Sequence, residues 1–224
     1  MKIISERKGF QADHSSTSYE FLAIDRKLGK GEKAKVSKLS SRANPTSSRV
    51  SFSYNGDYSD LPGGWEPLMA KYYDVMYSES YDWWTLAIAF HADKEVTEKI
   101  KGYAFNGVDD LGVNVKEEGG RLTVSINCHL DTSSIFTSSR GRYSEYDDED
   151  DDEDDGEDET SCRDPLLKLL ASNREYLEKG DCRLLYGIWL EYGDQEDDDS
   201  APPETEMTKL PTAIKKMLSL LEQV

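Results

Sequence analysis

The chain has 224 residues, enough for one sizeable domain or two small ones. Hydrophobic residues make up 37% and charged residues 32%, so we expect part of the length to lie outside a packed core. The 13 Tyr, 6 Phe and 4 Trp exclude a wholly disordered protein, because disordered sequences are poor in aromatic residues.

The net charge of −18 is concentrated in two short segments. Residues 145–159 and 194–199 hold 13 and 5 acidic residues and no basic residue, so together they account for the whole net charge. Because the rest of the chain is balanced, the acidic pI does not exclude contact with nucleic acid. The first segment contains the acidic run Asp147, Asp148, Glu149, Asp150, Asp151 and Asp152.

The sequence predicts a cytoplasmic protein that does not enter a membrane. Three widely spaced cysteines do not form a disulfide framework and indicate a reducing compartment. Residues 1–9 lack the apolar segment of a secretory signal, and the longest apolar run, 86–90, is far too short to span a bilayer.

The first part of the chain alternates between strand and helix patterns, after a polar arm at residues 1–18. Alternating β-forming residues or short apolar runs predict strands at 19–25, 49–54, 82–90, 112–116 and 121–130. Apolar residues at helical spacing predict helices at 31–43, 65–81 and 96–103. The last two strands flank Glu118-Gly119-Gly120, which indicates a hairpin.

The second part contains acidic segments and helices. Residues 132–163 are rich in Ser, Thr and acidic residues, and we expect a disordered linker because like charges repel and no apolar side chain is available to bury. Asp164-Pro165 is typical of a helix start, and Gly180 of a helix end. Further helices are predicted at 182–192 and 210–221, separated by a second acidic segment at 194–203.

These patterns predict an α+β fold with a mixed or antiparallel sheet, helices on one face and a C-terminal helical subdomain. The expected organisation is a polar arm at 1–18, a sheet domain at 19–131, an acidic disordered linker at 132–163 and a helical subdomain at 164–224.

Several segments resemble a family of uncharacterised bacterial proteins. They are YEFLAIDRKL at 19–28, LSSRANPTSSRVSF at 39–52, LMAKYYDVMY at 68–77 and YLEKGDCRLLYGIWL at 176–190. The resemblance extends over nearly the whole chain outside the acidic segments. The resemblance implies that the gene lies in a prokaryotic operon of unknown or defence-related role. It identifies no catalytic residue.

Aromatic residues gather within residues 72–84. A helix buries one stripe and a strand alternates its faces, so some of these side chains are expected at the surface. Tyr and Trp dominate binding hot spots, which favours a protein-binding surface, with a thick hydrophobic core as the alternative. The candidate partner-binding residues are Tyr73, Tyr77, Tyr81 and Trp83.

Basic residues gather in the stretch 26–49, which has eight of them and one acid, Glu32. Such a patch can neutralise phosphates of a nucleic acid, or it can be covered by the acidic run, or it can be a solvated helix face. The candidate residues are Lys30, Lys33, Lys35, Lys38, Arg42 and Arg49.

Motifs for catalysis, metal binding or cofactor binding are weak. His14, His91 and His129 are the candidates for a hydrolase or transferase, but no spacing typical of zinc ligands, phosphate loops or dinucleotide sites accompanies them. We therefore expect a non-catalytic adaptor or regulatory protein that binds a protein partner, without cofactor or metal. Nucleic-acid binding through residues 26–49, gated by the acidic run, and a small His-dependent hydrolase are the alternatives.

Overall fold

The computed structural model describes residues 16–41, 43–55, 61–80, 83–136, 164–194 and 201–222. Seven strands form one sheet in the order β2-β1-β3-β4-β7-β6-β5, and every neighbouring pair is antiparallel. The predicted α+β class with an antiparallel sheet is confirmed.

The strands are β1 (Ser16–Leu22), β2 (Arg49–Asn55), β3 (Val75–Ser80), β4 (Trp83–Phe90), β5 (Phe105–Asn106), β6 (Gly112–Glu118) and β7 (Arg121–Cys128). The helices are α2 (Lys30–Ser37), α3 (Glu66–Lys71), α4 (Lys94–Lys101), α5 (Ser133–Phe136), α6 (Pro165–Glu178), α7 (Arg183–Tyr192) and α8 (Thr212–Leu218).

The sheet separates two hydrophobic clusters because successive side chains of a strand point to opposite faces. In β4, Leu86 and Ile88 belong to one cluster, whereas Ala87 and Ala89 belong to the other. We call the Leu86 side the helical face and the Ala87 side the groove face. Both sides of β4 are buried at these positions, so β4 lies at the centre of the fold.

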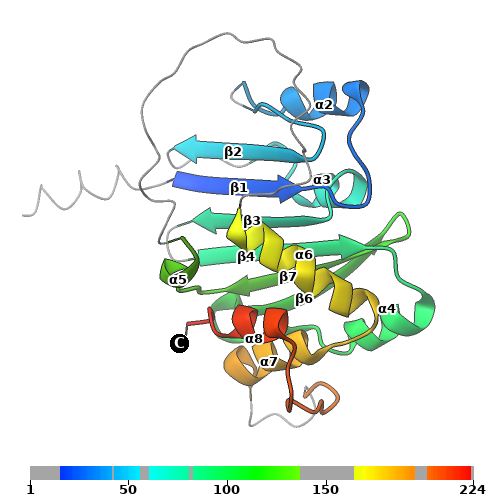
Figure 1. Ribbon diagram of the computed structural model, residues 1–224, viewed down its shortest axis with the longest axis vertical. Coiled ribbons are helices and arrows are strands. Elements are labelled where there is room, and N and C mark those ends of the chain that lie inside the picture. Colours follow the sequence, from blue (N-terminus) through cyan, green and yellow to red (C-terminus); the bar gives the residue numbers. More distant parts are fainter. Residues whose placement is uncertain are drawn as a thin grey trace, which may run out of the picture.

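The helical face is covered by the C-terminal helices and α4. Figure 1 shows α6 crossing the sheet over β3 and β4, with α8 beside α6 and α7 next to α8. The side chain of Asp164 accepts from the backbone N–H groups of Leu166 and Leu167 at 2.9 Å, which caps α6 as predicted. Side chains of α6, α7 and α8 belong to the same hydrophobic cluster as those of β4 and β7, so these helices share one core with the sheet.

The groove face carries α2 and α3, and α3 contacts β4 and β7, so helices lie on both faces of the sheet. Val36 of α2 and Met69 of α3 are fully buried in the same hydrophobic cluster as Phe21 and Phe52. The small side chains of Ala87 and Ala89 leave room for α3 to approach β4.

The single helix predicted over 65–81 is wrong. Only Glu66–Lys71 is helical, and Val75–Ser80 forms β3 between β1 and β4. The apolar residues Val75, Met76 and Tyr77 fit a helical spacing, but in a central strand consecutive apolar side chains are buried on both faces.

None of the helices in the described ranges combines the length and the apolar character that a membrane span requires.

Candidate functional site

The β4-β7-β6 side of the groove face has a polar surface that no helix of the described residues covers completely. In β7, half-buried Thr123, Ser125 and Asn127 alternate with fully buried apolar residues that face the helices. Their cross-strand neighbours are also polar or small, because Asn114 lies opposite Ser125 and Thr85 opposite Asn127. Short neutral donors and acceptors therefore form a grid on the sheet.

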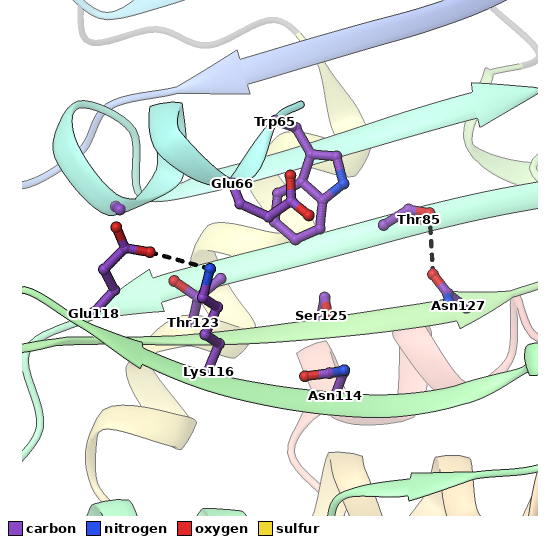
Figure 2. A pocket seen from close by; sticks show the side chains of 10 residues that line it. Trp65, Glu66, Thr85, Asn114, Lys116, Glu118, Thr123, Ser125 and Asn127 are labelled. Carbon is purple, nitrogen blue, oxygen red and sulfur yellow. Dashed lines mark hydrogen bonds and ion pairs between the residues drawn. The ribbon is translucent and has the colours of Figure 1, made fainter. Parts of the chain in front are cut away.

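Helix α3 overhangs this grid and forms one wall of a partly open cavity of about 320 Å³. Figure 2 shows Trp65 and Glu66 above the strands, with Thr123, Ser125 and Asn114 beneath them. We call this space the polar cavity. Its lining residues are Trp65, Glu66, Ala70, Thr85, Asn114, Lys116, Glu118, Thr123, Ser125 and Asn127.

A glycine turn places Trp65 and Glu66 at the start of α3. Gly63 and Gly64 have φ values of +83° and +77°, which are unfavourable for residues with a Cβ atom. A Cβ atom on Gly64 would also lie 2.5 Å from Oε2 of Glu66. The positive φ values of Gly63 and Gly64 thus set the direction in which the chain enters α3.

Some polar groups of the cavity are paired, and others are available. Thr85 Oγ1 donates to Asn127 Oδ1 at 3.1 Å, and Lys116 Nζ lies 3.1 Å from Glu118 Oε2. Among the described parts of the chain, the side chains of Glu66, Ser125 and Asn114 form no hydrogen bond or ion pair with another side chain. The cavity therefore offers one uncompensated carboxylate, neutral polar groups and an indole ring.

The predicted aromatic surface is not assembled as expected. Tyr73 and Tyr77 are buried in the clusters on opposite faces of the sheet. The Tyr77 hydroxyl donates to Asp164 Oδ2 at 2.8 Å, and desolvation raises its pKa. Trp83 is half-buried with its ring against His129, while Tyr81 lies outside the described residues. Tyr73 and Tyr77 therefore contribute to the core and present little area to a partner.

The basic residues are divided between two faces. Lys30, Lys35 and Lys38 are exposed on or beside α2, and Lys33 is half-buried there. Arg49 lies on the helical face instead, with Nη2 3.3 Å from Glu20 Oε2. Arg42 and the acidic run Asp147–Asp152 lie outside the described residues.

The two histidines that the structure describes do not share a site. The Nδ1 atom of His91 is 3.0 Å from the Gly120 carbonyl oxygen, beyond the Phe90–Leu122 pair. His129 follows Cys128 at the other end of the same strand pair, so on the order of 20–25 Å of strand separates them. His14 lies outside the described residues, and within those described no group of three or more His, Cys, Asp or Glu side chains is arranged to hold a metal.

Sequence reasoning did not single out Trp65, Glu66 or the polar side of β7. The signal for β7 was present as alternation of Leu122, Val124 and Ile126 with three polar residues. That alternation predicts a solvated face as readily as a binding site. Only the position of α3 over the strands distinguishes the two, and this position depends on contacts between distant segments.

No protein-family model and no curated protein matches the chain. Among solved structures, the chain is similar to the regulatory subunit of aspartate kinase from Thermus thermophilus in its ligand-free form. The identity is 15%, the match covers 51% of this chain and 83% of that chain, and the TM-score is 0.23. A score this low carries no argument about fold or function.

Proposed function

We propose that the protein is a non-catalytic adaptor or regulatory protein that binds a protein partner in the polar cavity. The observation that carries the proposal is the indole of Trp65 and the unpaired carboxylate of Glu66 over a grid of short neutral side chains. Trp residues are enriched at binding hot spots because they bury a large area at a small entropy cost.

The chemistry of the cavity suits a polypeptide segment. The hydroxyls of Thr123 and Ser125 and the amide of Asn114 can both donate and accept, as the peptide groups of an extended segment require. The carboxylate of Glu66 favours a Lys or Arg side chain in that segment. The carboxylate of Glu118 is already paired with Lys116, so the binding charge comes from Glu66.

The competing interpretation is a sheet face that is simply solvated.

The resemblance to bacterial proteins makes the products of neighbouring genes the first candidate partners. Co-purification of these products with the full chain, followed by calorimetry with the partner recovered, tests the proposal. We expect Ser125→Arg, which fills the cavity without removing a core contact, to weaken binding at least about 30-fold, equivalent to about 2 kcal/mol.

The matched control is Leu190→Ala, which changes an exposed apolar side chain of α7 away from the cavity. It should bind like the unmodified chain. The proposal is abandoned if Ser125→Arg and Trp65→Ala both bind the partner with unchanged affinity while their circular dichroism spectra show a native fold.

A further inference from the structure

A second groove lies on the other side of α3, between α3 and α2. It has a volume of about 190 Å³ and is mainly apolar. Val36 and Leu68 are buried at its base, and Leu39 and Tyr72 are half-buried in its walls. We call it the α2–α3 groove. Its remaining lining residues are Lys35, Pro62, Gly64, Pro67 and Lys71.

The groove is separate from the polar cavity because α3 turns different side chains toward each. Glu66 and Ala70 line the polar cavity, whereas Pro67 and Lys71 line the α2–α3 groove. Prolines in the walls offer no N–H donor, and the aliphatic side chains offer no polar group. An apolar side chain is therefore the chemically suitable occupant.

Two lysines line the groove and two more lie on or beside α2. Lys35 and Lys71 are exposed lining residues, and α2 adds Lys30 with Lys38 directly after its end. Within the described segments, these four lysines form no ion pair.

The acid on α2, Glu32, is paired with an arginine. Both carboxylate oxygens of Glu32 accept from the Arg26 guanidinium at 2.9 Å, and Oε2 also accepts from the Gly29 N–H at 2.9 Å. These hydrogen bonds, with a smaller contribution from the charge of Lys35, lower the pKa of Glu32 to about 2, so Glu32 interacts mainly with Arg26. The lysines at the groove remain available for negative groups of a ligand.

We propose that the α2–α3 groove binds an acidic segment of another protein, with one large apolar side chain in the groove and flanking Asp or Glu residues on Lys35 and Lys71. This inference uses a surface distinct from the polar cavity and does not depend on the function proposed for it. Nucleic acid is a poorer match, because a phosphate backbone would use the lysines and leave the apolar groove empty.

Fluorescence anisotropy with the full chain tests the proposal. The probe is a short labelled peptide of Asp and Glu residues with one central Leu, and its control replaces that Leu with Ser. We expect the Leu peptide to bind at least about 10-fold more tightly than the Ser peptide, because only the first fills the groove. Equal affinity for the two peptides, or stronger binding of a single-stranded oligonucleotide of equal charge, overturns the proposal.

Charge-reversal variants separate the groove from general electrostatics. The double variant Lys35→Glu, Lys71→Glu should weaken binding of the Leu peptide at least about 10-fold. The control Lys215→Glu, Lys216→Glu makes the same change of net charge on exposed residues of α8 and should leave binding within about twofold. Equal loss in both variants overturns the assignment to the groove.

A deletion variant identifies the source of the occupant. The full chain and a variant lacking residues 143–160 should bind the Leu peptide with similar affinity. Binding that occurs only after the deletion overturns the assignment to another protein, since the chain's own acidic segment would then be the ligand. Ser125→Arg should bind the Leu peptide normally, so failure of this inference and failure of the proposed function remain distinguishable.

Discussion

Arg121 and Asp74 form a buried ion pair at the ends of four strands. Arg121 Nη2 donates to Asp74 Oδ1, while Asp74 Oδ2 accepts from the backbone N–H groups of Ile24 and Asp25. The side chains are 11% and 3% exposed. Because Arg121 also donates to the carbonyl oxygens of Tyr73 and Ala89, the pair joins the segments that end β1, precede β3, end β4 and begin β7.

Replacing Asp74 with Asn should destabilise the protein by about 3–5 kcal/mol, because it leaves the Arg121 guanidinium buried without a counter-charge. Urea unfolding followed by circular dichroism measures the change in the free energy of unfolding. The control Glu175→Gln, on the exposed side of α6, should stay within about 0.5 kcal/mol of the unmodified chain. A loss below about 1 kcal/mol in the free energy of unfolding of Asp74→Asn would contradict the expectation that the Arg121–Asp74 ion pair stabilises the fold.

Arg174 connects α6 to the same region at a smaller expected cost. Its Nε donates to the Ala89 carbonyl oxygen at 3.0 Å, and its Nη2 lies 2.5 Å from Asp25 and 2.8 Å from Glu178. In Arg174→Met both carboxylates can turn to water, because their side chains are 44% and 33% exposed. We expect a loss of about 1–2 kcal/mol in the same unfolding assay, smaller than for Asp74→Asn. A larger loss in the free energy of unfolding for Arg174→Met than for Asp74→Asn would show that anchoring α6 to the sheet matters more than joining the strands.

The sequence predicted the elements whose signals are local. Asp164 with Pro165 correctly predicted the start of α6, and Gly180 with φ +71° correctly predicted its end. The Gly119-Gly120 turn between β6 and β7 was predicted for the same reason, since both glycines have positive φ. In each case the residue type itself restricts the backbone.

Features that depend on distant contacts were not predicted. Val75, Met76 and Tyr77 fit a helical spacing, and only pairing with β1 and β4 makes them a strand. Likewise, no local pattern says that Trp65 overhangs Ser125, because the two residues meet only when α3 packs against β4. The candidate site was therefore much less predictable than the strands that form its base.

Cys128 and Cys182 should react slowly with thiol reagents in the folded protein. Both are buried, and desolvation raises the pKa of Cys128 and raises the pKa of Cys182 to about 11. At about pH 8 the thiolate, which is the reactive form, is then scarce at both residues. In a Cys162→Ser variant, an aromatic disulfide reagent should label less than about a tenth of these thiols in native buffer and both of them in urea. Rapid labelling of the native variant would show that one thiol is accessible.

Glu20 should make the protein less stable as the pH rises above the ordinary carboxyl range. Glu20 lies on β1, where burial raises its pKa from 4.5 even though Ser51 Oγ donates to Oε2 at 2.7 Å and Arg49 lies beside it. A raised pKa means that the folded protein holds this proton more tightly than the unfolded chain. The corresponding stability is therefore fully present below the unfolded pKa of 4.5 and is lost as the pH rises through the folded pKa.

The variant Glu20→Gln tests this sign, because the amide does not titrate and its carbonyl oxygen can still accept from Ser51. The free energy of unfolding of Glu20→Gln relative to the unmodified chain should increase between about pH 4 and pH 7, since all other titrating groups are common to both proteins. Urea unfolding at several pH values measures this difference. A difference that is constant with pH would show that the Glu20 carboxyl has the same pKa in the folded and unfolded protein. A difference that decreases as the pH rises would show that Arg49 lowers the pKa of Glu20 more than burial raises it.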